Sequence, residues 1–354
     1  MNPRQLHITN YTLRVIWRLR NSVTGIIALL SFVGVLTAQS NYADAFLEIG
    51  TSPRTIALGQ ATVALPFHPA GYLSNPASSG FVRKLHINGL YINQFGLADF
   101  TALGFTIPTG KKYQWGIQAV SLFIGNIPEH PDLMGIQNLE ARRDSIRALT
   151  ASGFSYFSDR ETAVNFNVSR NFTSLIDLGW QTTEFPIKIP VGLNVRLIHK
   201  SLYNLTGVGV GFDLGTMFIV ELKNIFFYEA LGELVVGTSL TNIADTRLFW
   251  NSKKEDAVPM QWLSGIRYTQ KFGKLPMNLA FYYQKNNQYE DERRYGIECA
   301  IFDVVHLRIG RNEGTYQSGI GITFNRYGKT MSIGYSFSDH ELGNAHRLGG
   351  WVSF

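Results

Sequence analysis

Three residue types that could form a hydrolytic site occur on separate segments of the chain: Ser239, His199 and Asn194. A serine nucleophile needs a histidine base, and the base needs an orienting partner such as an asparagine or an acid. No nucleophile motif of the Gly-x-Ser-x-Gly type surrounds any serine, and the order of residues cannot bring these three together by itself. We therefore expect no enzymatic activity.

Two further patterns could bind a phosphate or a metal. Gly207-x-Gly209-x-Gly211 lacks the third glycine of a dinucleotide-binding loop, and its period of two continues through Asp213 and Gly215. That continuation predicts a strand with small side chains on one face. The 8 histidines are scattered and none belongs to a His-Glu-x-x-His motif. We expect no catalytic, cofactor-binding or metal-ligating residues and no cofactor.

The net charge of +6 could suggest a nucleic-acid partner. Four arginines, and no acids, lie in the first 38 residues, and without them 28 of the 32 basic residues remain against 26 acidic residues. An excess of two positive charges is too small to attract a phosphate backbone. We therefore expect no nucleic-acid binding.

The segment 1–38 has the features of a secretory signal peptide. A basic stretch ends at Arg20, an apolar stretch follows from Val23 to Leu36, and Thr37-Ala38 precede Gln39. The alternative is an uncleaved anchor, but an apolar core of about 14 residues is shorter than the ~20 that a membrane-spanning helix needs. We expect export and cleavage after Ala38. The only cysteine is Cys299, so neither a lipidated cysteine after the cleavage site nor an intramolecular disulfide is expected.

After residue 38 the chain consists of segments that alternate apolar with polar or small residues, as in 191–197, 208–214, 305–310 and 319–324. Segments of ~10 residues with this period, separated by turns, are typical of membrane β-barrels. Turns are expected at 108–110, 158–160, 312–314 and 325–328. The alternative is a soluble β-sandwich, but only 16% of the residues are charged, against about 25% in soluble domains. The pattern predicts an all-β transmembrane antiparallel barrel in the outer membrane, surrounded by lipid.

Charged side chains on the lipid face of a barrel cost ~2–4 kcal/mol at mid-membrane. The positions of Arg196, Asp213, Glu298 and Arg308 within their alternating segments place all four on the lumen side. About 15 candidate strands follow Lys84, and because single-chain barrels have an even number, we predict 14 over residues 84–354. The charged stretch 126–148 is expected to be a long outer loop. The final Phe354 closes an alternating strand, as in signals for the barrel-assembly machinery.

Residues 39–83 differ from the rest. Four prolines between residues 51 and 80 exclude a regular strand or long helix, so a compact hatch inside the barrel is expected. In the motif Asn75-Pro76-Ala77, the asparagine can bond nearby backbone while the proline starts a helical turn. Such a turn could be purely structural or part of a moving gate.

The order of several segments resembles the PorV/PorQ family within the FadL-like group of outer-membrane barrels. The residues that carry the resemblance are 45–54, 57–61, Asn75-Pro76-Ala77, 209–215, 240–243, 294–298, 307–310, 335–337 and 346–347. The resemblance implies a 14-stranded barrel with an N-terminal hatch that contains the Asn-Pro-Ala motif. It also implies either type IX secretion, with cargo or machinery proteins bound at the cell surface, or passage of hydrophobic compounds.

Two functions therefore stay open. A secretion-associated protein would use long polar loops to bind exported cargo or secretion-system partners, and 126–148 suits that role. A channel would need an apolar pocket for a hydrophobic ligand between hatch and wall, to which Phe46, Leu47, Ile49, Phe67 and Tyr72 could contribute. The same side chains could instead only pack the hatch. The resemblance favours the first function.

Overall fold

The computed structural model describes residues 42–68, 70–110, 112–130, 133–177, 184–273, 275–287, 292–339 and 343–354. The expected signal peptide lies outside these residues. In the described part, no helix has the length and apolar character needed to cross a membrane.

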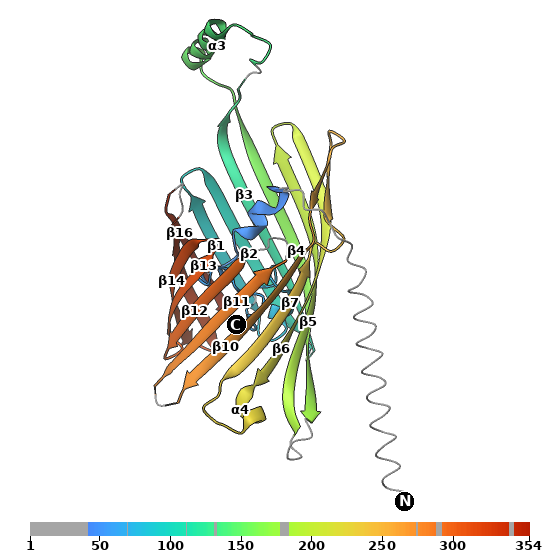
Figure 1. The fold of residues 1–354 in the computed structure, drawn as a ribbon, viewed down its shortest axis with the longest axis vertical. Helices are drawn as coiled ribbons and strands as arrows, with labels where there is room; N and C mark the ends of the chain where they lie inside the picture. Colours follow the sequence, from blue (N-terminus) through green and yellow to red (C-terminus); the bar gives the residue numbers. More distant parts are fainter. Residues whose placement is uncertain are drawn as a thin grey trace, which may run out of the picture. The chain divides into compact units, whose positions relative to one another are not determined.

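The wall is a closed antiparallel ring of 14 strands, which confirms the predicted fold class and strand number (Figure 1). β1 pairs with β16, from His86 opposite Ser353 to Ile92 opposite Arg347, and β5 pairs with β6, so no edge is left open in the ring. The ring strands are β1 (His86–Gln94), β2 (Ala98–Thr109), β3 (Tyr113–Pro128), β4 (Tyr156–Asp177), β5 (Glu184–Leu202), β6 (Leu205–Glu221), β7 (Glu233–Thr241), β10 (Gln261–Phe272), β11 (Met277–Asn286), β12 (Arg293–Ile301), β13 (Val305–Asn312), β14 (Thr315–Arg326), β15 (Lys329–Ser338) and β16 (Ala345–Ser353).

The two faces of the wall differ as the alternation predicts. On β6 the side chains of Val208, Val210 and Phe212 are about half exposed, whereas Gly209 and Asp213 are buried on the other face. Large apolar side chains are likewise exposed on the outer face of strands around the ring, including Leu193, Ile266, Ile309 and Ile333. A continuous apolar outer belt on a closed, even-stranded barrel is the character of a bacterial outer-membrane protein.

The two ends of the barrel carry different connections. One end has the connection from β3 to β4, which contains α3 (Leu139–Ser152), and a second hairpin formed by β8 (Thr246–Trp250) and β9 (Glu255–Val258). The other end carries α4 (Leu222–Phe226) and several short turns (Figure 1). Because outer-membrane barrels have longer loops outside the cell, the α3 end is the outer end.

Two details of the sequence analysis need correction. The expected loop at 126–148 begins later, because β3 continues to Pro128, and its second half is the helix α3, capped by Asn138. The expected turn at 158–160 is wrong, since β4 runs through it and pairs with β3 and β5. Asp159 and Arg160 lie near the outer end of a 22-residue strand, and beyond the hydrocarbon layer a strand tolerates charge on both faces.

Residues 42–83, called the inner segment below, pack against the lumen side of the wall. They contain η1 (Tyr42–Glu48), α2 (Pro53–Ala57) and η2 (Pro76–Ser79). Both α2 and η2 start with a proline behind a capping side chain, Ser52 or Asn75, that accepts a backbone N–H bond. Whether the inner segment acts as a hatch stays a prediction.

Inward-facing glycines let the inner segment approach the wall. A Cβ at Gly310 would overlap the backbone of Leu58 and Gly59, and a Cβ at Gly192 would overlap that of Pro76. Backbone or side-chain atoms of the inner segment also lie within 3.2 Å of the Cβ position at Gly116, Gly215, Gly237, Gly296, Gly319 and Gly349, which lie on strands from β3 round to β16. The inner segment therefore touches the wall on all sides of the lumen.

We expect that Gly310→Ala and Gly192→Ala destabilise the barrel by about 1–3 kcal/mol, because the added methyl group overpacks a backbone contact. Urea titration of the purified protein in detergent, read as the heat-modifiable folded band on a gel, measures the change. Gly89→Ala is the control, since Gly89 lies on β1 with only an ordinary contact, to Leu103 at 3.5 Å. Equal midpoints for all three variants would contradict the role of the glycines.

Candidate functional site

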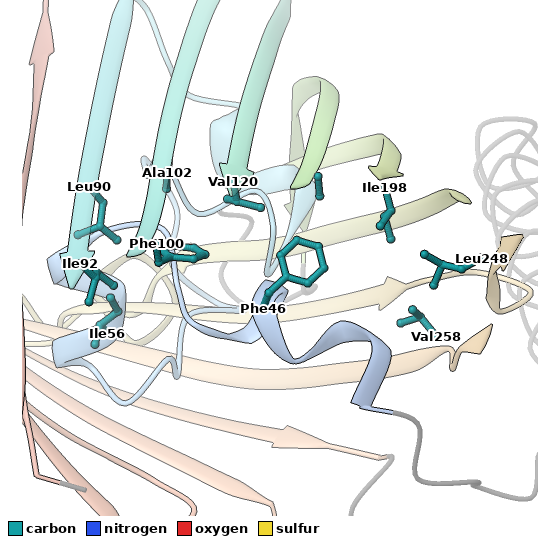
Figure 2. Close-up of a cluster of buried hydrophobic side chains, with 11 residues drawn as sticks. Phe46, Ile56, Leu90, Ile92, Phe100, Ala102, Val120, Ile198, Leu248 and Val258 are labelled. Atoms are coloured by element: carbon teal, nitrogen blue, oxygen red, sulfur yellow. The ribbon is translucent and has the colours of Figure 1, made fainter. Parts of the chain in front are cut away.

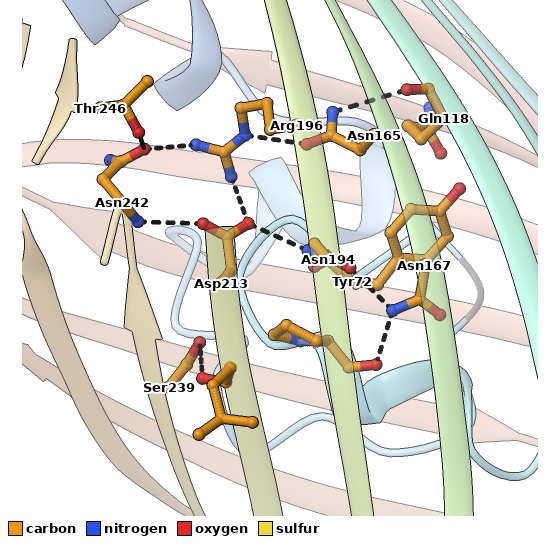
Figure 3. A network of polar contacts seen from close by, with 12 residues as sticks. Tyr72, Gln118, Asn165, Asn167, Asn194, Arg196, Asp213, Ser239, Asn242 and Thr246 are labelled. Atoms are coloured by element: carbon orange, nitrogen blue, oxygen red, sulfur yellow. Dashed lines mark hydrogen bonds and ion pairs between the residues drawn. The ribbon is translucent and has the colours of Figure 1, made fainter. Parts of the chain in front are cut away.

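A buried polar network joins three wall strands to the turn after β7. Arg196 on β5 and Asp213 on β6 form an ion pair of 2.7 Å, with side-chain exposures of 4% and 0%. Arg196 also donates from Nε to Asn165 Oδ1 and from Nη1 to Asn242 Oδ1, both at 2.8 Å. Asp213 Oδ1 accepts the backbone N–H of Asn242 at 3.0 Å. Figure 3 shows the ion pair between these asparagines. Hydrogen bonds at each end of a buried ion pair compensate for its desolvation.

The same network continues to the inner segment. Asn194 Nδ2 donates to Asp213 Oδ2 at 3.1 Å and to the Tyr72 carbonyl oxygen at 2.7 Å. Asn167 Nδ2 donates to the carbonyl oxygen of Pro76 at 3.0 Å (Figure 3). These amide groups satisfy backbone oxygens that the irregular chain leaves without partners.

The Asn-Pro-Ala motif lies at this contact. Asn75 is fully buried; its Oδ1 accepts the N–H of Ala77 at 3.0 Å, and its Nδ2 donates to the carbonyl oxygens of Val63 at 2.7 Å and Thr216 at 3.2 Å. Pro76 is the first residue of η2 and Ala77 is buried in it. Asn75 thus connects two turns of the inner segment with β6.

A second charged cluster holds the other side of the inner segment. Glu298 on β12 pairs with Arg54 of α2 at 2.7 Å and with Arg308 on β13 at 2.8 Å, and it accepts a hydrogen bond from the Tyr282 hydroxyl at 2.8 Å. Glu298 and Arg308 are buried on the lumen side. The alternation of apolar and polar residues in the strands predicted that Glu298 and Arg308 lie on the lumen side. It could not predict that Arg54 pairs with Glu298, because the position of Arg54 depends on the fold of α2.

One side of the outer half of the lumen is apolar. Phe46 and Ile56 of the inner segment pack against inward-facing wall side chains (Figure 2). We call these wall residues the apolar wall cluster: Leu90, Ile92, Phe100, Ala102, Val120, Ala163, Ile198, Leu248 and Val258. Leu47 and Ile49 pack against the cluster as well. Of the five residues proposed to line an apolar pocket, Phe46, Leu47 and Ile49 lie here, whereas Tyr72 lies beside Gly116 and Phe67 stacks on Phe81.

The wall is interrupted beside this cluster. β7 ends at Thr241, and the β8–β9 hairpin that follows pairs with β6 only over Gly207–Gly209. In between, Asn242, Ala244 and Asp245 have positive φ values of 53°, 61° and 57°. Such conformations cost ~1–3 kcal/mol each for residues other than glycine and persist only where neighbours enforce them. Here the enforcing bonds include those of Asn242 to Arg196 and Asp213.

Hollows lie on both sides of the interruption. On the lumen side, Thr241 and Asn242 line a cavity of about 70 Å³ together with Leu47, Leu73 and Arg196. On the membrane side there is a mainly apolar groove of about 580 Å³, lined by Thr162, Val164, Leu197, Ile198, His199, Val208, Gly209, Val210, Ala244, Asp245, Arg247 and Phe249. Ile198 belongs to both the groove and the apolar wall cluster. The chain segment after β7 contributes Thr241 and Asn242 to the lumen cavity and Ala244 and Asp245 to the outer groove.

The hydrolytic residues considered from the sequence lie apart. Asn194 and Ser239 are buried on the lumen side, and Ser239 donates to the Leu214 carbonyl oxygen at 3.3 Å, while His199 is exposed in the outer groove. The described residues contain no group of three or more His, Cys, Asp or Glu side chains that could hold a metal ion.

We expect that Asp213→Ala lowers the free energy of unfolding by about 3–5 kcal/mol, because it leaves Arg196 buried without its partner. The double variant Asp213→Ala/Arg196→Met should recover part of this loss, since it removes the unpaired charge. Urea titration in detergent measures both, with Arg143→Gln as the control, because Arg143 pairs with Glu140 at 64% and 70% exposure on α3. A double variant less stable than Asp213→Ala would argue against an electrostatic cause.

No protein-family model and no curated protein matches the sequence. Among solved structures, the chain is similar to the CymD monoaromatic hydrocarbon channel, with 11% identity, a TM-score of 0.46 and coverage of 86% of this chain and 98% of that one. It is similar to a TodX monoaromatic hydrocarbon channel mutant at 11% identity and a TM-score of 0.48, with coverage of 86% and 98%. A Pseudomonas aeruginosa FadL homologue matches at 10% identity and a TM-score of 0.45, with coverage of 87% and 98%. These scores are too low to support a functional argument. Membership of the PorV/PorQ family stays a prediction.

Proposed function

We propose that this outer-membrane barrel takes up hydrophobic small molecules into the outer half of its lumen and releases them sideways into the membrane. The observation that carries the proposal is the apolar wall cluster. Barrel lumens are usually polar because they face water. A lumen surface of Leu90, Ile92, Phe100 and Val120 instead resembles the lining of a pocket for apolar ligands.

The N-terminal part of the inner segment occupies this surface in the structure. Phe46, from the short helix η1, is 1% exposed and fills the centre of the cluster (Figure 2). A hydrophobic ligand entering from outside would replace Phe46 and its neighbours on the same apolar surface. Side chains of the chain itself therefore make the apolar contacts that a ligand would make with this surface.

A straight path through the barrel is blocked. Below the apolar wall cluster, the inner segment contacts the wall all around and is held by the Arg196–Asp213 network and by Glu298. Passage toward the periplasm would break several buried ionic and hydrogen bonds at once, each costly to leave unpaired. A sideways path past the interruption after β7 displaces only the turn of residues 242–245, of which Asn242 lines the lumen cavity and Ala244 and Asp245 line the apolar outer groove. This route also keeps an apolar solute out of water.

A disulfide across the interruption tests the sideways route. A Cβ built on Gly211 of β6 lies 3.4 Å from the Cβ of Thr246, close to the 3.5–4.5 Å of disulfides. In a Cys299→Ser background, the oxidised Gly211→Cys/Thr246→Cys variant should take up the apolar fluorophore N-phenyl-1-naphthylamine at least tenfold more slowly in intact cells, whose outer membrane excludes the dye. Reduction of the disulfide should restore the rate, since it releases the chain after β7.

The single variant Gly211→Cys in the same background controls for the substitution itself. Fluorophore binding to the oxidised double variant should persist, because the apolar wall cluster is unchanged. Unchanged transport by the oxidised protein would refute the sideways route. Absence of fluorophore binding by the wild-type protein would refute the function.

We propose a second function, binding of secretion partners or exported cargo, because one part of the structure favours it. β3 and β4 extend to the helix α3, whose Leu139 and Ile146 are 68% and 50% exposed. An amphipathic helix with an uncovered apolar side is suited to fit a groove on a partner. This function needs no ligand pathway through the wall.

Replacement of residues 133–152 by a short Gly-Ser linker should abolish recovery of a protein partner when the tagged barrel is purified from outer membranes, because α3 is removed. Mass spectrometry of the co-purified proteins provides the readout. The variant Leu139→Ala/Ile146→Ala, which keeps the helix and removes its apolar contacts, should lose the same partner, whereas Arg143→Gln, which changes only an exposed polar side chain of α3, should keep it. Recovery of the same partners with the linker variant would exclude α3 as the binding surface.

A further inference from the structure

Three positively charged side chains meet at the turn from β14 to β15, at the end of the barrel opposite α3. Arg326 is the last residue of β14 and Lys329 is the first residue of β15, and the two lie opposite each other in the strand pair. Lys84, which precedes β1, reaches the same turn, because its Nζ donates to the Gly328 carbonyl oxygen at 2.9 Å. All three side chains are exposed. We call Arg326, Lys329 and Lys84 the basic rim patch.

The two strand residues of the patch lie on the membrane side of the wall. In β14, Arg326 follows Ile322 and Phe324 at alternate positions, and these two side chains are 50% and 40% exposed on the outer face. In β15, Lys329 has the same relation to Ile333, which is 57% exposed. Because side chains alternate between the two faces of a strand, both cations lie at the inner edge of the apolar outer belt. This is the depth of the lipid headgroups of the inner leaflet.

No acidic side chain balances this charge. The segments that form this part of the rim are 81–88, 322–333 and 350–354, and they contain no Asp or Glu. Among the described residues, no carboxylate, that of Phe354 included, forms an ion pair with a residue of the basic rim patch. The patch therefore presents an uncompensated positive charge to the membrane surface.

The pairing of Arg326 with Lys329 is unfavourable by itself. Like charges directly opposite each other in an antiparallel strand pair repel and destabilise it. At the same end of the barrel, Lys223 instead has an acidic partner, Glu221, at 3.4 Å. An anion bound between Arg326 and Lys329 would turn the repulsion into two attractive interactions.

The surroundings of the patch define the rest of that anion. The Arg326 guanidinium lies 5.0 Å from the centroid of the Tyr327 ring, which is 85% exposed, and Lys329 Nζ lies 4.5 Å from the centroid of the Phe354 ring. Tyrosine rings with an apolar body and a polar tip are enriched at the membrane–water interface. On the membrane side the patch continues into the apolar side chains of β14 and β15. A matching molecule has a negative charge at headgroup depth and an apolar part in the hydrocarbon layer.

We infer that the basic rim patch is a binding site for an anionic phospholipid of the inner leaflet, with the lipid phosphate between Arg326, Lys329 and Lys84. The acyl chains of this lipid lie along the outward side chains of β14 and β15. Clusters of Lys and Arg at a membrane surface attract anionic lipids. A zwitterionic lipid fits less well, because its ammonium group adds a fourth cation. The site is far along the ring from the interruption after β7 and does not depend on the proposed transport.

Native mass spectrometry of the full-length protein in detergent, titrated with phosphatidylglycerol and with phosphatidylethanolamine, tests the site. We expect the first phosphatidylglycerol to bind at least tenfold more tightly than the first phosphatidylethanolamine, because only the former has a net negative charge. Equal affinities would overturn the inference. Glycerol 1-phosphate, a soluble phosphate ester, should not displace the bound lipid at tenfold excess, since it lacks acyl chains. Displacement would assign the patch to free phosphate esters and would also overturn the inference.

Two double variants locate the binding. Arg326→Gln/Lys329→Gln should weaken phosphatidylglycerol binding at least tenfold and remove the preference over phosphatidylethanolamine. The matched control is Lys223→Gln/Lys271→Gln, which removes two cations from the same end of the barrel and changes the net charge equally, and it should keep the preference. The heat-modifiable band on a gel confirms that both variants are folded. An equal loss in the two variants would mean that binding follows total charge, and the basic rim patch would not be the site.

Discussion

Residues 42–83 run through the inside of a membrane barrel as largely irregular chain, so their backbone N–H and C=O groups cannot rely on a neighbouring strand for hydrogen bonds. The wall meets this demand in two ways. Its inward-facing glycines let the two backbones approach, and its inward-facing amides, such as Asn167 and Asn194, bond the free carbonyl oxygens of Pro76 and Tyr72. The positions of η1 on the apolar wall cluster and of the turn after β7 depend on these contacts between the inner segment and the wall.

The lumen is consequently divided by depth. Where the inner segment is bonded to the wall, the surface consists of charged and amide side chains in closed networks, and these hold a single arrangement. On the outer side of these networks, η1 contacts the wall mainly through apolar side chains such as Phe46. Apolar contacts have no directional requirement, so the same surface can accept a different apolar group. The strained turn after β7 lies beside this boundary, where Asp213 and Arg196 hold it on one side and the apolar groove lies on the other.

Sequence alternation was sufficient to predict the fold class and the lumen side for Arg196, Asp213, Glu298 and Arg308, because the lipid penalizes charge on one face of every strand. It gave about 15 strands, and only the rule that single-chain barrels have an even number of strands led to 14. The alternation did not reveal the apolar wall cluster. In β1, Tyr91 on the outer face and Ile92 on the inner face are both apolar, so the two faces cannot be told apart from the sequence. The β8–β9 hairpin was also missed, because it breaks the regular succession of wall strands. Asp159 and Arg160 were wrongly predicted to form a turn. Consecutive charged residues exclude a strand only where that strand crosses the hydrocarbon layer, and β4 extends beyond it. Arg54 gave no signal, because its role arises from an ion pair with Glu298, which is far away in the sequence.

The glycine contacts also restrict how the inner segment can enter or leave the ring. The inner segment fills the lumen at the level of Gly192, Gly310 and Gly349, and the last of these lies on β16, the strand that closes the ring against β1. A finished ring would offer no room to thread an irregular chain past these backbone contacts. In the folded protein the inner segment therefore cannot enter or leave the ring unless these contacts break, and the contact of Pro53 with Gly349 is one of them. Wall and inner segment are in this sense a single folding unit, and we expect loss of either to expose the other, because each supplies the surface that the other buries.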